Sequence, residues 1–142
     1  MSPVRNIYLD TNAIIHFAEG EEDILKPFFI RGFALGVRFF TSEITLAEVM
    51  VVPMREKNRP LVEKYENSLR SDALLTVVEV DRSVLLRSAE LRANHGGHAV
   101  DAIHVASAEL GNCELLISSD ERLRIPRSMR RVAIRDVNAI GI

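Results

Sequence analysis

Residues 98–110 have the sequence HAVDAIHVASAEL, in which apolar side chains occupy almost every face of a helix. We expect this helix to be covered on most sides, and Gly111 directly after it is typical of a helix end. At about 3.6 residues per turn, Asp101 shares a stripe with Val105 and Ala108, which places one carboxylate at the edge of the core. Burying an unpaired charge is unfavourable, whereas an acid in a first turn can complement the helix dipole. Asp101 is therefore either a dipole partner or a metal ligand.

Short apolar strands alternate with helices along the rest of the chain. We expect strands at residues 6–9, 37–40, 74–80, 114–117 and 131–134, and further helices at residues 13–18, 21–35, 42–52, 60–69 and 82–94. Pro53 is expected to end the helix at 42–52. This alternation predicts an α/β fold, with residues 1–142 forming one domain around a central parallel sheet of four to five strands that has helices on both faces.

Three more acids stand where local structure does not fully explain them. Asp10 and Asp120 lie just beyond predicted strands, and the carboxyl ends of parallel strands border the functional crevice of such sheets. Glu48 interrupts the apolar stripe of Ile44 and Val52, two turns into its helix, where it cannot be a cap. The alternatives are helix N-caps for the two aspartates and a lysine or arginine partner for the glutamate.

Four carboxylates at one edge of a sheet would repel each other and raise each other's pKa unless a cation holds them. Oxygen-only ligands favour a hard divalent ion, Mg²⁺ or Mn²⁺. A rival zinc site would use His98 and His104, which flank Asp101, but the sequence has no H-x-x-x-H pair. Neutral packing or hydrogen-bonding roles fit these histidines better.

Four segments, taken in order, resemble the acidic motifs of PIN-domain ribonucleases: YLDTNAII, SEITLAEV, DAIHVASA and LISSD. At this length the chain most resembles the VapC toxins of toxin–antitoxin pairs. The resemblance covers essentially the whole chain and implies a PIN-like fold. It also implies that the catalytic, metal-binding acids are Asp10, Glu48, Asp101 and Asp120. The residues that it implies line the site are Thr11, Asn12 and Ser118.

The activity implied by the resemblance is a Mg²⁺- or Mn²⁺-dependent endoribonuclease that hydrolyses phosphodiester bonds to 5′-phosphate and 3′-hydroxyl ends. The implied partners are an RNA substrate, a cognate antitoxin and a second copy of the chain in a homodimer. The apolar run VMVVPM at residues 49–54 is either core or such a partner surface. Alternatives are an RNA-processing nuclease, or a catalytically silent RNA-binding module, without an antitoxin. A haloacid-dehalogenase-type phosphatase would need a D-x-D pair, but position 12 is Asn12.

Composition limits how RNA could be bound. The net charge of −2 argues against non-specific coating of nucleic acid, yet fifteen of the 18 basic residues are arginine, which binds phosphate bidentately. Six of these arginines lie between residues 122 and 135. We expect Arg122, Arg124 and Arg127 to contact RNA phosphates, and the alternative is a solvated face or a protein contact.

The remaining expectations concern the cell compartment and the thiol. No apolar run is long enough to span a membrane, and the first residues, MSPVRNIYLD, lack the apolar centre of a signal peptide. We therefore expect a cytoplasmic protein without membrane contact. The single cysteine, Cys113, cannot form an internal disulfide and is expected to be a small buried apolar residue.

Overall fold

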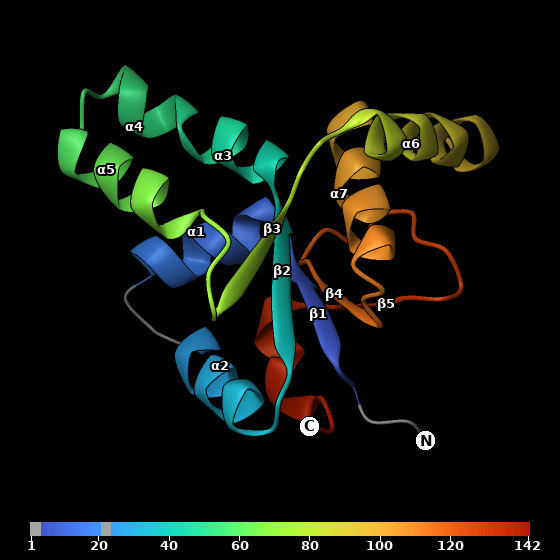
Figure 1. Cartoon of the computed structure of the whole chain (residues 1–142), viewed down its shortest axis with the longest axis horizontal. Coiled ribbons are helices and arrows are strands. Elements are labelled where there is room, and N and C mark those ends of the chain that lie inside the picture. Colours follow the sequence, from blue (N-terminus) through green and yellow to red (C-terminus); the bar gives the residue numbers. More distant parts are fainter. Residues whose placement is uncertain (1–3, 21–23) are drawn as a thin grey trace.

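The computed structural model describes residues 4–20 and 24–142, and its centre is a five-stranded parallel sheet (Figure 1). The strands are β1 (Asn6–Leu9), β2 (Arg38–Ser42), β3 (Leu75–Val78), β4 (Leu115–Ile117) and β5 (Arg130–Val132). Their order across the sheet is β3-β2-β1-β4-β5, and every neighbouring pair is parallel. The predicted α/β class and parallel sheet are confirmed.

Helices cover both faces of the sheet, as Figure 1 shows. One face carries α1 (Thr11–Glu19), α2 (Leu25–Ala34), α3 (Glu43–Val49), α5 (Arg59–Ser68) and the 3-10 helix η1 (Ile134–Ala139), and α4 (Val51–Arg55) continues from α3. The other face carries α6 (Arg82–His95) and α7 (Ala99–Leu110). The sheet is thus the middle layer of three.

Alternation along β1 divides its side chains between the two layers of helices. Ile7 and Leu9 join the core on the α1 face, whereas Tyr8 joins the core under α7. Successive residues of a strand point to opposite faces, and all three side chains are at most 3% exposed. The same alternation directs the Tyr8 hydroxyl toward α7, where it contacts the site described below.

Helix α7 is buried as the sequence predicts, but its end differs in detail. Gly111 has a φ of −80°, so it does not use the left-handed conformation, and Asn112 adopts that conformation instead, with a φ of 53°. A Cβ atom on Gly111 would lie 3.0 Å from the Phe40 ring. Glycine is therefore needed for close packing of the helix end against β2, while asparagine makes the turn.

Two local predictions are wrong, and one falls partly outside the described residues. Pro53 does not end a helix, because α3 stops at Val49 and Pro53 lies in the first turn of α4, where a backbone N–H has no acceptor in any case. The chain from Ile134 forms η1 rather than continuing a strand. The predicted helix at 21–35 begins at Leu25, and residues 21–23 lie outside the described ranges.

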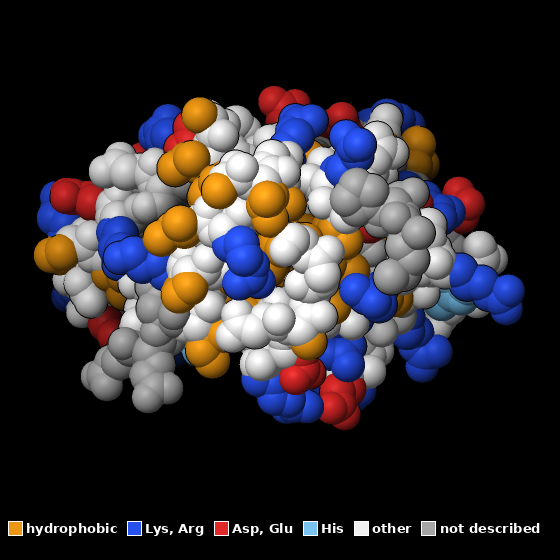
Figure 2. Space-filling view, turned by 90° about the horizontal axis from the view of Figure 1, so that it is seen from below, with side chains coloured by type: hydrophobic (Ala, Val, Ile, Leu, Met, Phe, Trp, Pro, Cys, Tyr) orange, Lys and Arg blue, Asp and Glu red, His pale blue; other side chains and the backbone are white. Residues whose placement is uncertain are grey.

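The burial of the single thiol and the mixture of charges on the surface match what the composition predicts. Cys113 is 4% exposed, and burial raises the pKa of its thiol to about 12, so it is a small buried apolar residue. No helix in the described ranges has the length and apolar character to span a membrane. Figure 2 shows the molecule from below, and there hydrophobic side chains lie among both basic and acidic ones. No single sign of charge covers that face.

Candidate active site

The site lies beside β1, at the point in the sheet where successive strands stop being added on one side of β1 and begin to be added on the other. From the central strands β1 and β4, the order runs outward to β2 and β3 on one side and to β5 on the other. Ligands of open α/β sheets bind at the carboxyl ends of the strands at such a switch point. The backbone N–H of Asp10 donates to the carbonyl of Ile117 at 3.2 Å, so the ends of β1 and β4 are joined there.

Asp10 is both a helix cap and a poorly solvated acid. Its Oδ1 accepts a hydrogen bond from the backbone N–H of Ala13 at 2.9 Å, which confirms the N-cap interpretation. The residue is 9% exposed, and burial raises the pKa of its carboxyl group. Hydrogen bonds from Ser118 and Ala13 oppose that rise, whereas the nearby Glu48 carboxylate adds to it. Asp10 is therefore a helix N-cap whose carboxylate is also repelled by the carboxylate of Glu48.

Glu48 is held by two donors from different elements. Its Oε1 accepts from Thr11 Oγ1 at 2.5 Å and from His104 Nε2 at 2.7 Å. Burial alone would raise the pKa of this carboxyl group, but the hydrogen bonds from His104 and Thr11 outweigh it and the pKa is lowered. The alternative of a lysine or arginine partner is wrong, because a histidine and a threonine take that place.

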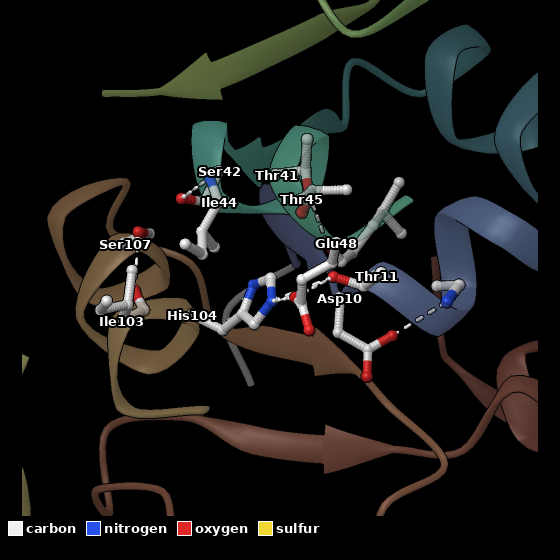
Figure 3. A network of polar contacts seen from close by, with 12 residues as sticks. Asp10, Thr11, Thr41, Ser42, Ile44, Thr45, Glu48, Ile103, His104 and Ser107 are labelled. Carbon is white, nitrogen blue, oxygen red and sulfur yellow. Dashed lines mark hydrogen bonds and ion pairs between the residues drawn. The ribbon is translucent and has the colours of Figure 1, made fainter. Parts of the chain in front are cut away.

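His104, for which the sequence predicted a packing or hydrogen-bonding role, lies within this site. It is 4% exposed, and its Nδ1 lies 2.6 Å from the Tyr8 hydroxyl. Its Nε2 lies 3.1 Å from Thr11 Oγ1, and Figure 3 shows His104 beside Thr11 and Glu48. The expected hydrogen-bonding role is confirmed, but its target is Glu48. The available signal was the spacing of three from Asp101, which puts both side chains on neighbouring parts of one helix face.

Asp101 and Asp120 lie apart from the first two acids, in an open cavity that neither Asp10 nor Glu48 borders. They border a cavity between the α6–α7 turn and the chain after β4, together with His95, Gly96, Gly97, His98, Arg122 and Arg124. Asp120 Oδ1 accepts from the backbone N–H of Arg122 at 3.0 Å, as a turn cap would, and lies 3.4 Å from its Nε. The Arg122 side chain is 92% exposed, so this ion pair is weak.

The other predicted site residues lie around these two parts. Thr11 and Ser118 contact the acids directly, whereas Asn12 is exposed on the first turn of α1. Arg127 is exposed but does not border the cavity.

The donors available for a metal ion are hard oxygens, and they are grouped as two pairs of acids. Within residues 4–20 and 24–142, no three histidine, cysteine or acidic groups lie close enough together to hold an ion. Carboxylate and hydroxyl oxygens are the donors that Mg²⁺ and Mn²⁺ prefer, so the residue types fit such an ion, but among the described residues the structure does not bring the four predicted acids together into one ligand set. A zinc site through His104 fits less well, because both of its ring nitrogens already contact Tyr8 and Glu48.

Comparisons with known proteins place the chain in a family. A family model described as the PIN domain matches residues 7–127, and no curated protein matches. A toxin–antitoxin complex from Klebsiella pneumoniae superposes with a TM-score of 0.63 at 25% identity, covering 82% of this chain and 88% of that one. VapBC2 from Rickettsia felis bound to promoter DNA gives 0.70 at 15% identity, covering 89% and 98%.

DNA-bound VapBC from Salmonella typhimurium gives a TM-score of 0.67 at 20% identity, covering 92% of this chain and 98% of that one. At such low identity the Rickettsia and Salmonella structures show a shared fold alone. The family match spans most of the chain and includes both Asp10, just after β1, and Asp120, beyond the end of β4. The chain therefore belongs to the PIN domain family rather than to the haloacid-dehalogenase family.

Proposed function

We propose that this PIN domain is a Mg²⁺- or Mn²⁺-dependent endoribonuclease that hydrolyses RNA phosphodiester bonds, and that it is the toxin of a type II toxin–antitoxin pair. PIN domains are generally nucleases. The observation that carries the proposal is the nearly buried Asp10 at the end of β1, with its pKa raised by burial and further by the carboxylate of Glu48. The charged form of Asp10 is unfavourable beside a second carboxylate, and a divalent cation would relieve that repulsion.

The acids proposed to hold the ion are Asp10, Glu48, Asp101 and Asp120. When bound, a divalent ion supplies water activation and charge stabilisation on the phosphodiester. Asp10 is fixed for this role by its bond from Ala13, and Glu48 is fixed by Thr11 and His104. Asp101 and Asp120 border the open cavity, through which a substrate would reach the acids.

The cavity suits a polyanion, and we assign single-stranded or looped RNA to it. Arg122 and Arg124 border the cavity beside two acids, so cationic groups for phosphate stand next to the proposed metal ligands. His95 and His98 add ring donors and faces on which a base can stack. Arg127 is exposed outside the cavity, and we assign it a peripheral phosphate contact.

The assignment as a toxin is supported by the toxin–antitoxin complex from Klebsiella pneumoniae, which has 25% identity to this chain. An exposed apolar surface on α4 adds to it: Val51 and Val52 are each 51% exposed and Met54 is 59% exposed. Exposed apolar patches mark protein contacts. We assign this patch to contact with an antitoxin or with a second copy of the chain. The first part of the same run, Val49 and Met50, is core.

The test is an RNA-cleavage assay with purified protein in Mg²⁺, in Mn²⁺ and in EDTA. The variant is Asp10→Asn, which keeps a capping oxygen, and the matched control is Asp136→Asn, an exposed aspartate on η1. We expect cleavage that requires the metal, that falls by about 100-fold or more in Asp10→Asn, and that is unchanged in Asp136→Asn. Cleavage in EDTA would overturn the proposal. RNA binding without cleavage in either metal would instead favour the silent RNA-binding module.

A further inference from the structure

A buried chain of hydrogen bonds leads from the core to one oxygen of Glu48. Tyr8 is fully buried under α7, and its hydroxyl lies 2.6 Å from Nδ1 of His104. The opposite ring nitrogen, Nε2, lies 2.7 Å from Glu48 Oε1. Figure 3 shows the edge of the imidazole directed at Glu48 and Thr11. Three elements, β1, α7 and α3, are therefore connected through one histidine ring.

The partners of the ring determine which nitrogen carries the proton. A carboxylate only accepts hydrogen bonds, so the short contact to Glu48 Oε1 requires a proton on Nε2. A neutral ring then has an unprotonated Nδ1, which accepts from the Tyr8 hydroxyl. The Glu48 carboxylate thus fixes the Nε2-protonated tautomer, and the Tyr8 hydroxyl, which donates to Nδ1, anchors the opposite side of the ring.

The two carboxylate oxygens of Glu48 differ in their hydrogen-bond partners. Thr11 and His104 both donate to Oε1, while Oε2 receives no hydrogen bond or ion pair from any residue in the described ranges. Glu48 stands one residue before the end of α3, and a long acidic side chain there would otherwise lose rotamer freedom on binding a ligand. With Oε1 already held, the side chain is oriented before any cation arrives.

We propose that Tyr8 and His104 are positioning residues for Glu48. The Tyr8 hydroxyl anchors the His104 ring through Nδ1, and His104 together with Thr11 occupies Oε1 so that Oε2 is presented to a divalent cation. The inference rests on the proposed function, because it takes Glu48 as a ligand of the ion. Neither Tyr8 nor His104 touches the substrate or the ion in this scheme.

The first test measures Mn²⁺ affinity by calorimetry on folded protein without RNA. We expect His104→Ala to weaken Mn²⁺ binding by about 10- to 100-fold, the range found when groups that orient metal ligands are removed. His104→Gln, whose amide nitrogen can replace Nε2 as a donor, should recover most of that loss. His16→Gln, on α1 away from the network, serves as the histidine control and should bind as wild type does.

The second test keeps the inference falsifiable if His104→Ala does not fold. The tautomer of His104 is read from nitrogen NMR of the imidazole in the wild type and in Tyr8→Phe, which keeps the buried ring but removes the hydroxyl. We expect the Nε2-protonated form in the wild type and also in Tyr8→Phe, where the Glu48 carboxylate still requires that proton, and Mn²⁺ binding about threefold or more weaker in Tyr8→Phe because the ring loses its anchor at Nδ1.

The outcomes separate this inference from the proposed function. An Nδ1-protonated wild type, or folded variants that bind Mn²⁺ as tightly as the wild type, would overturn the positioning role and leave the nuclease proposal standing. A wild type that binds Mn²⁺ with the expected losses in the variants, yet cleaves no RNA, would overturn the nuclease and leave the positioning role standing. A wild type that binds no Mn²⁺ would overturn both.

Discussion

The two halves of the carboxyl edge of the sheet differ in how they hold their acids. The inner pair, Asp10 and Glu48, is anchored by hydrogen bonds from Ala13, Thr11 and His104. The outer pair, Asp101 and Asp120, borders an open cavity beside exposed arginines. Under the proposed function, this difference implies a division of labour, in which the inner pair is preorganised to hold an ion and the outer pair completes the site on the side where RNA would enter.

The physical difference between the pairs is solvation. Charges interact strongly where water is excluded and weakly where it is not, so the repulsion between Asp10 and Glu48 acts on the stability of the fold. Around the cavity, water and the guanidinium of Arg122 screen the acids. Substitutions in the inner pair should therefore change stability and activity together, while those in the outer pair should change activity alone.

The largest expected effect is the fall in the rate of RNA cleavage when an acid of the outer pair is replaced. Asp101→Asn removes one proposed ligand charge, and we expect the rate of RNA cleavage in Mg²⁺ to fall by about 100-fold or more. The melting temperature of the metal-free protein should stay equal to that of the wild type or rise slightly. Cleavage time courses and thermal melts check this pair of results. Full activity in this variant would remove the outer pair from the site.

The next effect concerns the arginines of the cavity. Arg124→Ala should raise KM for RNA by about three- to tenfold with little change in kcat, because this arginine is proposed to bind phosphate and is not a proposed metal ligand; Arg122→Ala should raise KM similarly and also lower kcat, because Arg122 pairs with Asp120. The salt dependence of RNA binding should become shallower by about one ion per lost contact. Arg70→Ala, an exposed arginine paired with Glu66 on the helix α5 side, is the control. An equal loss in the control would mean that charge alone, and not the cavity, attracts RNA.

A smaller effect is expected on stability at the inner pair. The pKa of Asp10 is raised in the folded protein, so the unfolded chain loses its proton first and folding becomes less favourable as pH rises through this window. Asp10→Asn should therefore raise the melting temperature of the metal-free protein at pH 7 by a few degrees, about 2–4 °C. The gain should vanish below the ordinary pKa of aspartate. Melts at pH 3 and pH 7 check the sign, and added Mn²⁺ should stabilise the wild type more than this variant.

The smallest effect should have the opposite sign. The pKa of Glu48 is lowered in the folded protein, so its stabilisation is present above the ordinary pKa of glutamate and is lost as pH falls through the folded value. Glu48→Gln should lower the melting temperature of the metal-free protein at pH 7 by about 1–2 °C, since the group is partly exposed and screened. The difference should disappear in acid. Equal signs for Glu48→Gln and Asp10→Asn would contradict the contrast within the inner pair.

Local patterns predicted the frame of this site. Asp10 and Asp120 were recognisable because each follows an apolar strand, Asn6–Leu9 or Leu115–Ile117. Glu48 was recognisable because it interrupts an apolar stripe. These features depend on neighbours within about one or two helical turns, which a sequence displays directly.

The contacts that complete the site could not be predicted in the same way. His104 and Glu48 are 56 positions apart, and their contact depends on how α7 and α3 pack at the end of β1. The role of Pro53 likewise depends on where α4 begins, which no rule about proline alone specifies. The grouping of the acids into two pairs reflects repulsion and side-chain placement in three dimensions, which periodicity does not contain.

The central claim is that the inner and outer pairs, which the structure holds as two separate pairs, come together around one divalent ion. The most direct measurement is a calorimetric Mn²⁺ titration of the wild type, Asp10→Asn and Asp120→Asn, with Asp136→Asn as the control. The account predicts one dominant site that weakens by about tenfold or more in each of the two site variants and is unchanged in the control. Wild-type affinity in Asp120→Asn, or two independent sites each lost in only one variant, would contradict it.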